Sequence, residues 1–375
     1  MGSYLVIMLC AFGVTAASTP LVRRMAINRQ WLALPDERKV HKLPTPDVGG
    51  IAMFIGVVVS LFVAWRMGRF SNLFVGNNEP AGIVIGAFII LCFGVRDDIK
   101  EISAPARVVG TVVAGLVLVY FGVTMFYFRL PFIDVFQVSN DWTPIVTVIW
   151  LLMMTQAINL IDGLDGLAAG IVAIASGTFF IYSQHLAHLG LLSEPNLGPL
   201  IAAITAGVCL GFLPYNFSPA SIFMGDGGAY LLGFLLAVST SVVGGRADPA
   251  TQGFSGQTYF FLAPLFIPII ILGVPIFDVL FAIIRRVGRG EDFSKADKGH
   301  LHHRLINLGH GPRRAVVILW GWTILLSGFV IFPVFNPSTS RSLAIFGIIA
   351  LVLSLYTVLH PDLHWRNSRS AKAES

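Results

Sequence analysis

An Asn and two Asp residues recur at every third position in the segment NLIDGLDG, which lies between two long apolar stretches. Side chains three residues apart lie on one side of a helical turn, so Asn159, Asp162 and Asp165 are expected to face a common site. Carboxylates at the boundary of a membrane are costly, and for that reason they indicate a functional site. The structural alternative is a Gly-rich turn whose Asp side chains bond the backbone.

Two further segments carry carboxylates next to apolar stretches. Asp97 and Asp98 are adjacent in GVRDDIKE, and their mutual repulsion favours a proton on one of them unless a cation offsets it. A solvated helix end beside Arg96 and Lys100 is the alternative. Asp226 stands among glycines in FMGDGGAY, where it could cap the following helix. The same position suits a phosphate at a helix N-terminus and a carboxylate ligand of Mg2+.

Basic residues gather in two segments. GHLHHRLINLGHG contains a group of possible phosphate donors: His300, His302, His303 and Arg304. Their spacing would also suit zinc, but no Cys accompanies them, and the acidic clusters favour Mg2+. We therefore interpret them as donors to a phosphate or pyrophosphate, with a basic loop held against anionic lipid as the alternative. The basic residues of DERKVHKLPTPDVGG, among them Lys42, and its Gly49–Gly50 could contribute to the same phosphate-binding pocket.

The composition indicates a membrane protein. The chain has 375 residues, of which 55% are hydrophobic and 12% charged, about half the charged fraction of a soluble protein. Spans of about 20 apolar residues predict an all-α, polytopic integral membrane protein with about eleven transmembrane helices. The expected spans are 3–22, 49–66, 80–96, 106–127, 143–160, 167–187, 198–215, 227–245, 258–284, 315–334 and 341–360. One transmembrane catalytic domain would occupy 1–360, with a polar tail at 361–375, and short strands are expected at Phe126–Leu130 and Val135–Val138.

The distribution of charge predicts the orientation. Arg23 and Arg24 follow the first span. Most of the 25 Lys and Arg residues lie in or next to every second loop and in the tail. By the positive-inside rule, the N-terminus is outside and the C-terminus is cytoplasmic. The expected cytoplasmic segments are 23–48, 97–105, 161–166, 216–226 and 285–314.

Every polar cluster described above falls on this cytoplasmic face. An ion-coupled transporter would place its charged site near the bilayer midplane, where only Asp278 is expected. Carboxylates and cations at one surface instead suit Mg2+-assisted transfer of a phosphoryl group from a soluble diphosphate to a lipid phosphate.

The motifs FGVRDDIK, NLIDGLDGLAAG, FMGDGGAYLLG and HLHHRL resemble those of the polyprenyl-phosphate N-acetylhexosamine-1-phosphate transferases, glycosyltransferase family 4. HLHHR resembles the bacterial N-acetylglucosamine-1-phosphate branch. Phospho-N-acetylmuramoyl-pentapeptide transferases, the alternative, usually have consecutive histidines where Leu301 stands. The resemblance implies UDP-N-acetylglucosamine as donor, polyprenyl phosphate (undecaprenyl or decaprenyl) as acceptor and UMP as product. It also implies the bacterial plasma (inner) membrane, the first lipid-linked step of cell-envelope polysaccharide synthesis and no nucleic-acid partner, and it is compatible with a homodimer.

The resemblance also implies roles for single residues. Asp226 and Asn159 would coordinate Mg2+, for which Mn2+ could substitute. Phe223 would stack on the uracil and Asp165 would bond the nucleoside. The remaining residues expected to bind substrate are Arg107, His300, His302, His303, Arg304, Asp47 and Lys42.

The catalytic roles of Asp97, Asp98 and Asp162 stay open between two schemes. Asp97 or Asp98 could act as a base for the lipid phosphate, or Asp162 could be a covalent nucleophile. The second pKa of a phosphate monoester is about 6, so a strong base is not required. We therefore favour direct attack, with Asp97 and Asp98 controlling protonation and orientation.

Overall fold

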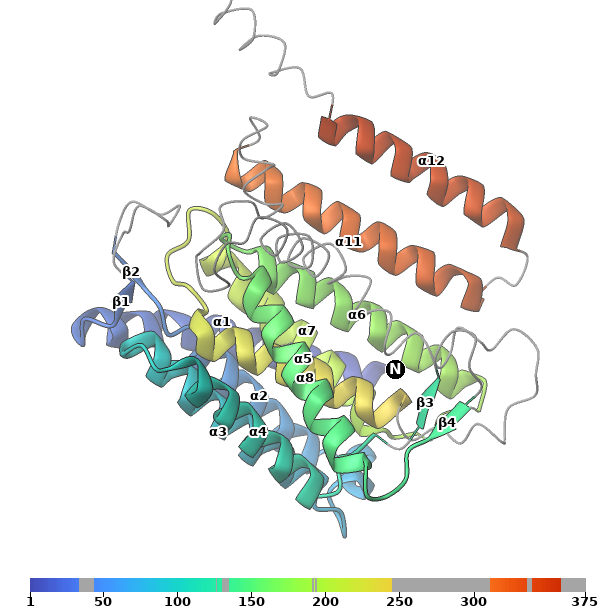
Figure 1. Cartoon of the computed structure of the whole chain (residues 1–375), viewed down its shortest axis with the longest axis horizontal. Helices are drawn as coiled ribbons and strands as arrows, with labels where there is room; N and C mark the ends of the chain where they lie inside the picture. The colour runs from blue at the N-terminus through green and yellow to red at the C-terminus, as the bar shows by residue number, and fades with distance from the viewer. Residues whose placement is uncertain are drawn as a thin grey trace, which may run out of the picture.

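Long helices make up most of the protein (Figure 1), and this computed structural model describes residues 1–33, 44–125, 127–129, 135–190, 192, 194–244, 311–335 and 339–358. The helices are α1 (Gly2–Asn28), α2 (Gly50–Arg66), the short η1 (Gly68–Leu73), α3 (Glu79–Ile99), α4 (Ala104–Tyr120), α5 (Thr143–Ile161), α6 (Leu167–His188), α7 (Leu197–Asn216), α8 (Gly225–Gly244), α11 (Pro312–Phe335) and α12 (Thr339–Val358). The strands are β1 (Leu32–Ala33), β2 (Thr45–Pro46), β3 (Tyr127–Arg129) and β4 (Val135–Gln137).

A helix occupies each expected span that lies within the described residues, but the end predicted for the span 106–127 is wrong. α4 ends at Tyr120, where Gly122 takes a positive φ, and Tyr127 already belongs to β3. Among the described residues, five helices are long and apolar enough to cross a membrane: α1, α5, α6, α7 and α8. α2 and α4 are shorter apolar helices. The mainly helical, multi-pass character is therefore confirmed, whereas the count of about eleven and the orientation stay predictions. The span 258–284, with Asp278, and the tail 361–375 lie outside the described residues.

Two antiparallel strand pairs accompany the helices. Tyr127 pairs with Gln137 in the β3–β4 pair, close to the strands predicted there. The β1–β2 pair, in which Leu32 faces Pro46, was not predicted, because two residues per strand leave no periodic pattern to read. This second pair leads directly into Asp47 and the start of α2.

Proline residues help to define where several helices begin. Pro80, Pro105 and Pro144 each stand in the first turn of α3, α4 or α5. Proline fits there because the first backbone N–H groups of a helix have no intrahelical partner. α7 begins differently, since the side chain of Asn196 accepts a hydrogen bond from the N–H of Gly198.

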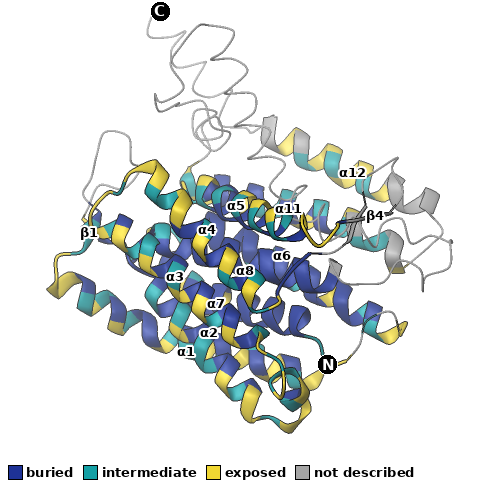
Figure 2. Ribbon diagram, turned by 60° about the horizontal axis from the view of Figure 1, so that its bottom comes forward, coloured by how far each residue is buried: buried dark blue, intermediate teal, exposed yellow. Residues whose placement is uncertain are grey.

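α8 is the central helix of the bundle and packs against α2, α3, α5, α6 and α7. Figure 2 shows α7 and α8 buried along most of their length. α3 crosses α8 very closely, because a Cβ atom on Gly94 would lie only 2.3 Å from the Cα atom of Gly227. Only glycine permits this approach, which brings the last turn of α3 to the first turn of α8.

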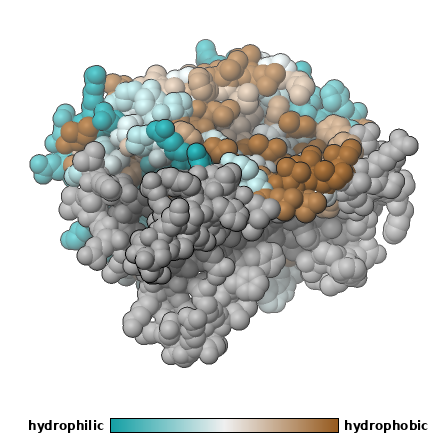
Figure 3. Space-filling model, turned by 90° about the horizontal axis from the view of Figure 1, so that it is seen from above, coloured by the Kyte–Doolittle hydropathy of each residue, from teal (hydrophilic) through white to brown (hydrophobic). Residues whose placement is uncertain are grey.

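The last two described helices extend from this core. α11 packs on α6, and α12 packs on α11 at the margin of the molecule (Figure 1). Figure 3, which looks on this side, shows large hydrophobic areas, while several hydrophilic residues gather toward its left-hand end. That is also the end at which α3 finishes and α8 begins.

Candidate active site

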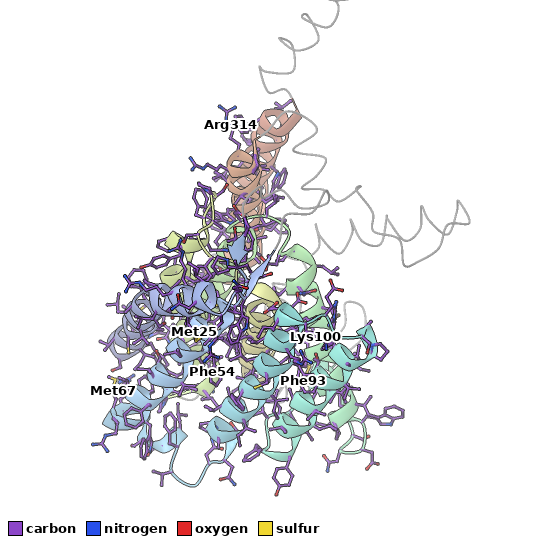
Figure 4. All side chains as sticks on the ribbon, turned by 90° about the vertical axis from the view of Figure 1, so that its left-hand side faces the viewer. Met25, Phe54, Met67, Phe93, Lys100 and Arg314 are labelled. Atoms are coloured by element: carbon purple, nitrogen blue, oxygen red, sulfur yellow. The ribbon has the colours of Figure 1, made fainter. Side chains whose placement is uncertain are left out.

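Residues from four separate segments meet at one end of the bundle. This end holds the C-terminal ends of α1, α3 and α5 and the N-terminal ends of α6, α8 and α11 (Figure 1). Figure 4 faces it, with Lys100 labelled at the end of α3 and Arg314 near the start of α11. The segments that the sequence placed on a common face therefore do lie together within the described residues.

Asp226 is joined to Asn159 across the α5–α8 contact. The Nδ2 atom of Asn159 donates a hydrogen bond of 2.6 Å to Oδ1 of Asp226. A second contact one turn away links Gln156 of α5 with the hydroxyl of Tyr230 of α8. The two residues expected to bind a cation are thus held at fixed relative positions by the packing of their helices.

Asp98 caps α8. One of its carboxylate oxygens accepts from the N–H of Asp226 at 2.6 Å, and the other accepts from the N–H of Gly227 at 3.2 Å. These two groups are orphan donors at the N-terminus of a helix, where negative charge is favoured. The cap of α8 therefore comes from α3, and the position considered above for a phosphate holds a protein carboxylate.

Glycine at position 225 makes this arrangement possible. Gly225 has φ of +68°, and a Cβ atom there would lie 2.5 Å from Oδ2 of Asp98. An L-residue would suffer both the strained backbone and the collision. The approach of Asp98 therefore explains Gly225, whereas a Cβ atom on Gly228 would instead meet Met224 at 2.7 Å.

Asp97 is buried and paired with Arg107. Its side chain is 2% exposed, and one carboxylate oxygen lies 2.6 Å from Nε of Arg107. The other oxygen accepts from Nη2 of Arg107 at 3.2 Å and from the N–H of Ile102 at 2.9 Å. A carboxylate at the C-terminus of a helix meets an unfavourable dipole, and Arg107 offsets that charge.

The carboxyl groups of Asp97 and Asp226 also lie beside each other. Two neighbouring carboxylates need a shared proton or a cation to relieve their repulsion. Asp98 is next to both Asp47 and Asp226, so carboxyl groups from three segments gather at this end of the bundle. A group of carboxylates of this kind could accommodate a cation.

Asp162 is the last residue of this acidic cluster. It follows α5, with its N–H bonded to the carbonyl of Asn159 at 3.2 Å. Burial, and then the neighbouring carboxylates of Asp47, Asp226 and Asp165, raise the pKa of Asp162 well above its ordinary value. A proton or a bound cation would therefore relieve the repulsion between Asp162 and its neighbours.

The α5–α6 loop is cross-linked to the α7–α8 loop. Asp165 accepts a hydrogen bond of 3.0 Å from the N–H of Ala220. Asn216 bridges the same loops, since its Oδ1 accepts from the N–H of Gly166 at 3.1 Å and its Nδ2 donates to the carbonyl of Ile222 at 3.2 Å. These hydrogen bonds couple the position of one loop to that of the other.

Phe223 is held by the chain around Asp47. Its N–H donates to the carbonyl of Pro46 at 2.8 Å, and its carbonyl accepts from the N–H of Gly49 at 2.9 Å. The half-buried side chains of Phe223 and Asp47 thus reach the same end of the bundle from opposite segments. Lys42, His300, His302, His303 and Arg304, which were also predicted to bind substrate, lie outside the described residues.

Several residues at this end of the bundle were not predicted from the sequence to belong to the site. Asn216 is 2% exposed and bridges two loops, and a polar side chain at the end of an apolar span was the available signal. Arg23 and Arg313 were used only to orient the chain. Both bond the α7–α8 loop.

The oxygen-rich side chains suit a hard cation. Within the described residues, no three His, Cys, Asp or Glu side chains form a ready metal cluster. Mg2+ commonly takes one or two carboxylates and completes its shell with water and substrate phosphates. Asp226, the neighbouring Asp97 and the amide oxygen of Asn159 provide such a partial set.

Comparison with known proteins supplies independent evidence. Residues 80–244 match the model of glycosyl transferase family 4. A decaprenyl-phosphate N-acetylglucosaminephosphotransferase of Mycobacterium leprae is 34% identical, over 91% of this chain and 88% of the relative. A probable undecaprenyl-phosphate N-acetylglucosaminyl 1-phosphate transferase of Bacillus subtilis is 36% identical, over 91% and 87%. A phospho-N-acetylmuramoyl-pentapeptide-transferase of Staphylococcus epidermidis is 24% identical, over 67% and 78%.

Proposed function

Because this chain belongs to glycosyl transferase family 4, we propose that it transfers N-acetylglucosamine 1-phosphate from UDP-N-acetylglucosamine to a polyprenyl phosphate of the membrane. The products are polyprenyl-diphospho-N-acetylglucosamine and UMP. We place the reaction at the cytoplasmic face of the bacterial plasma membrane.

The meeting of Asp98, Asn159, Asp162 and Asp226 at one end of an apolar helical bundle supports this proposal. A lipid phosphate and a soluble nucleotide must meet at the membrane surface. The acidic cluster provides a place for the cation that two anionic substrates require when they approach each other.

Asp226 and Asn159 hold Mg2+ in this proposal. Mg2+ held by these two residues would supply positive charge that offsets the charge of the diphosphate. The buried Asp97 orients Arg107, whose side chain is 36% exposed and can reach an incoming phosphate. Phe223 and Asp165 bind the nucleoside.

The transfer proceeds by direct attack. An oxygen of the polyprenyl phosphate forms the new bond to the β-phosphorus of the donor, while the bond from that phosphorus to the bridging oxygen breaks and UMP leaves with the electron pair. The attacking phosphate is mostly ionised at neutral pH, since its second pKa is about 6. In this scheme Asp98 acts by capping α8 with both of its oxygens, which orients the helix end that carries Asp226.

The decisive experiment measures UMP release by the purified protein in detergent with polyprenyl phosphate and Mg2+. Turnover is expected with UDP-N-acetylglucosamine, to be lost on chelation by EDTA and restored by added Mg2+ or Mn2+. Absence of turnover with any UDP-sugar would refute the enzyme reading. A covalent phospho-aspartate trapped with donor alone would overturn direct attack in favour of Asp162 as nucleophile.

A comparison of two donors tests which nucleotide sugar the protein uses. UDP-N-acetylmuramoyl-pentapeptide, offered to the same preparation, is expected to give no UMP. A preference for this second donor would move the chain to the related phospho-N-acetylmuramoyl-pentapeptide transferases.

A further inference from the structure

Two arginines from opposite ends of the chain hold the short segment 218–221 between α7 and α8. Nε of Arg313, in the first turn of α11, donates a hydrogen bond of 2.6 Å to the carbonyl of Ser218. Nε of Arg23, near the end of α1, donates one of 3.0 Å to the carbonyl of Ser221. Between these two carbonyls, the N–H of Ala220 donates to Asp165.

α11 is anchored beside the same loop through an aromatic side chain. The ring of Trp320 lies 5.6 Å from that of Phe217, and its Nε1 donates to the carbonyl of Leu167 at 3.4 Å. A Cβ atom on Gly170 would lie 2.1 Å from Trp320, so the indole lies directly against the backbone of α6. Trp320 thus sets the place of α11 relative to α6, and with it the place of Arg313.

The loop also has contacts of its own: the N–H and Oγ of Ser221 both donate to the carbonyl of Tyr215, at 2.8 and 2.9 Å. The two arginines add its connections to α1 and α11. Both arginines donate to backbone carbonyls, and a hydrogen bond from a charged donor is stronger than one between neutral groups. Their loss would let segment 218–221 move and take the N–H of Ala220 away from Asp165. The backbone of Phe223 is bonded to Pro46 and Gly49, so a movement of segment 218–221 would change the position of Asp165 relative to Phe223.

We propose that Arg23 and Arg313 are positioning residues that fix the nucleoside side of the donor site by holding the α7–α8 loop from two directions. The inference rests on the proposed function, which places the nucleoside at Asp165 and Phe223. Neither arginine contacts the donor itself. Their effect passes through the carbonyls of Ser218 and Ser221.

Arg24 provides a matched control. It follows Arg23 on α1, is exposed, and makes no hydrogen bond or ion pair within the part of the chain that the structure describes. Arg24→Gln removes the same positive charge from the same end of the bundle. It therefore reports any general electrostatic attraction of an anionic donor, without a change in the loop.

The test compares Arg313→Gln, Arg23→Gln and Arg24→Gln in the full-length protein, with UDP-N-acetylglucosamine as substrate and uridine as a competitive inhibitor. The first two variants are expected to raise both the KM of the donor and the Ki of uridine by about 3- to 30-fold, with kcat changed by less than about 2-fold. Arg313→Lys should recover part of the loss. Arg24→Gln should leave the Ki of uridine unchanged.

Uridine carries no phosphate, so it separates positioning from direct contact. A raised KM with an unchanged Ki of uridine would show that the arginines bind the diphosphate and would overturn the inference, as would equal effects in all three variants. If the wild-type protein fails to turn over the donor, the proposed function falls. The positioning role is then still decided by the Kd of uridine for the same variants in calorimetry.

Discussion

The side-chain amide of Asn159 donates a 2.6 Å hydrogen bond to Asp226, although 67 residues separate the two in the chain. The contact joins the last turn of α5 to the first turn of α8. Since the amide nitrogen faces Asp226, the amide oxygen is left for a cation or water. Two sequence motifs thereby form one site.

Replacement of Asp226 by Asn should abolish most activity and preserve the fold. Loss of groups that merely support a metal ligand costs about 10- to 100-fold, so loss of a proposed ligand is expected to cost more than about 100-fold in kcat/KM. The UMP-release assay measures this, and thermal unfolding checks the fold. Asp141→Asn, an exposed Asp in the loop before α5, is the control and should keep full activity. Full activity of Asp226→Asn would remove Asp226 from the cation site.

Replacement of Asp162 by Asn should lower activity but raise the melting temperature of the substrate-free protein at neutral pH. The raised pKa of Asp162 means that ionisation is less favourable in the folded than in the unfolded state. The penalty is present above the folded-state pKa and disappears as pH falls toward the unfolded value of about 3.9. The difference in melting temperature between variant and wild type should therefore shrink from pH 8 toward about pH 4 and also on addition of Mg2+. A wild-type protein that is more stable than the variant at every pH would contradict this.

Removal of Arg107 should leave the buried carboxylate of Asp97 without its cation. Arg107→Ala is expected to lower the free energy of unfolding by about 1–3 kcal/mol, toward the lower end because Arg107 is partly exposed. The double variant Asp97→Asn/Arg107→Ala should recover part of that stability and none of the activity. Denaturant titration in detergent gives the stabilities. Equal stability of wild type and Arg107→Ala would show that the ion pair contributes nothing to folding.

A methyl group at position 94 should separate α3 from α8. The new Cβ would lie 2.3 Å from the Cα of Gly227, and overpacking of this kind costs about 1–3 kcal/mol. Gly94→Ala should therefore lower both the melting temperature and the activity, because Asp98 moves with α3. Gly13→Ala in α1 is the control, since a Cβ there has nothing within 4 Å. It should keep full activity and should not lower the melting temperature.

Much of the architecture could be predicted because a helix that crosses a membrane requires an apolar stretch of about 20 residues, which is visible in the sequence. The expected ends of α2, α5 and α7 differ from the observed ends by at most one residue. The family could be predicted from four motifs, and the comparisons confirm it. A strand of two residues, such as β1, could not be predicted, because it is too short to show an alternation of apolar and polar side chains.

The partners of the acidic residues could not be predicted. The sequence shows that Asp97 and Asp98 are adjacent, but it does not show that one faces Arg107 and the other the amides of α8. That difference arises from the direction in which each side chain leaves α3, and from the close crossing at Gly94. The sequence shows Arg23 and Arg313 only as positive charges. It does not show what they contact, because their partners are backbone carbonyls.

The cap that Asp98 places on α8 has a practical consequence. The amide protons of Asp226 and Gly227 are bonded to a side chain of another helix, so they exchange with solvent deuterium only when α3 and α8 part locally. The exchange rates of these two amide protons therefore report how often this end of the bundle opens, and they can be measured in the substrate-free protein. A bound donor that stiffens the helix ends would slow both protons together.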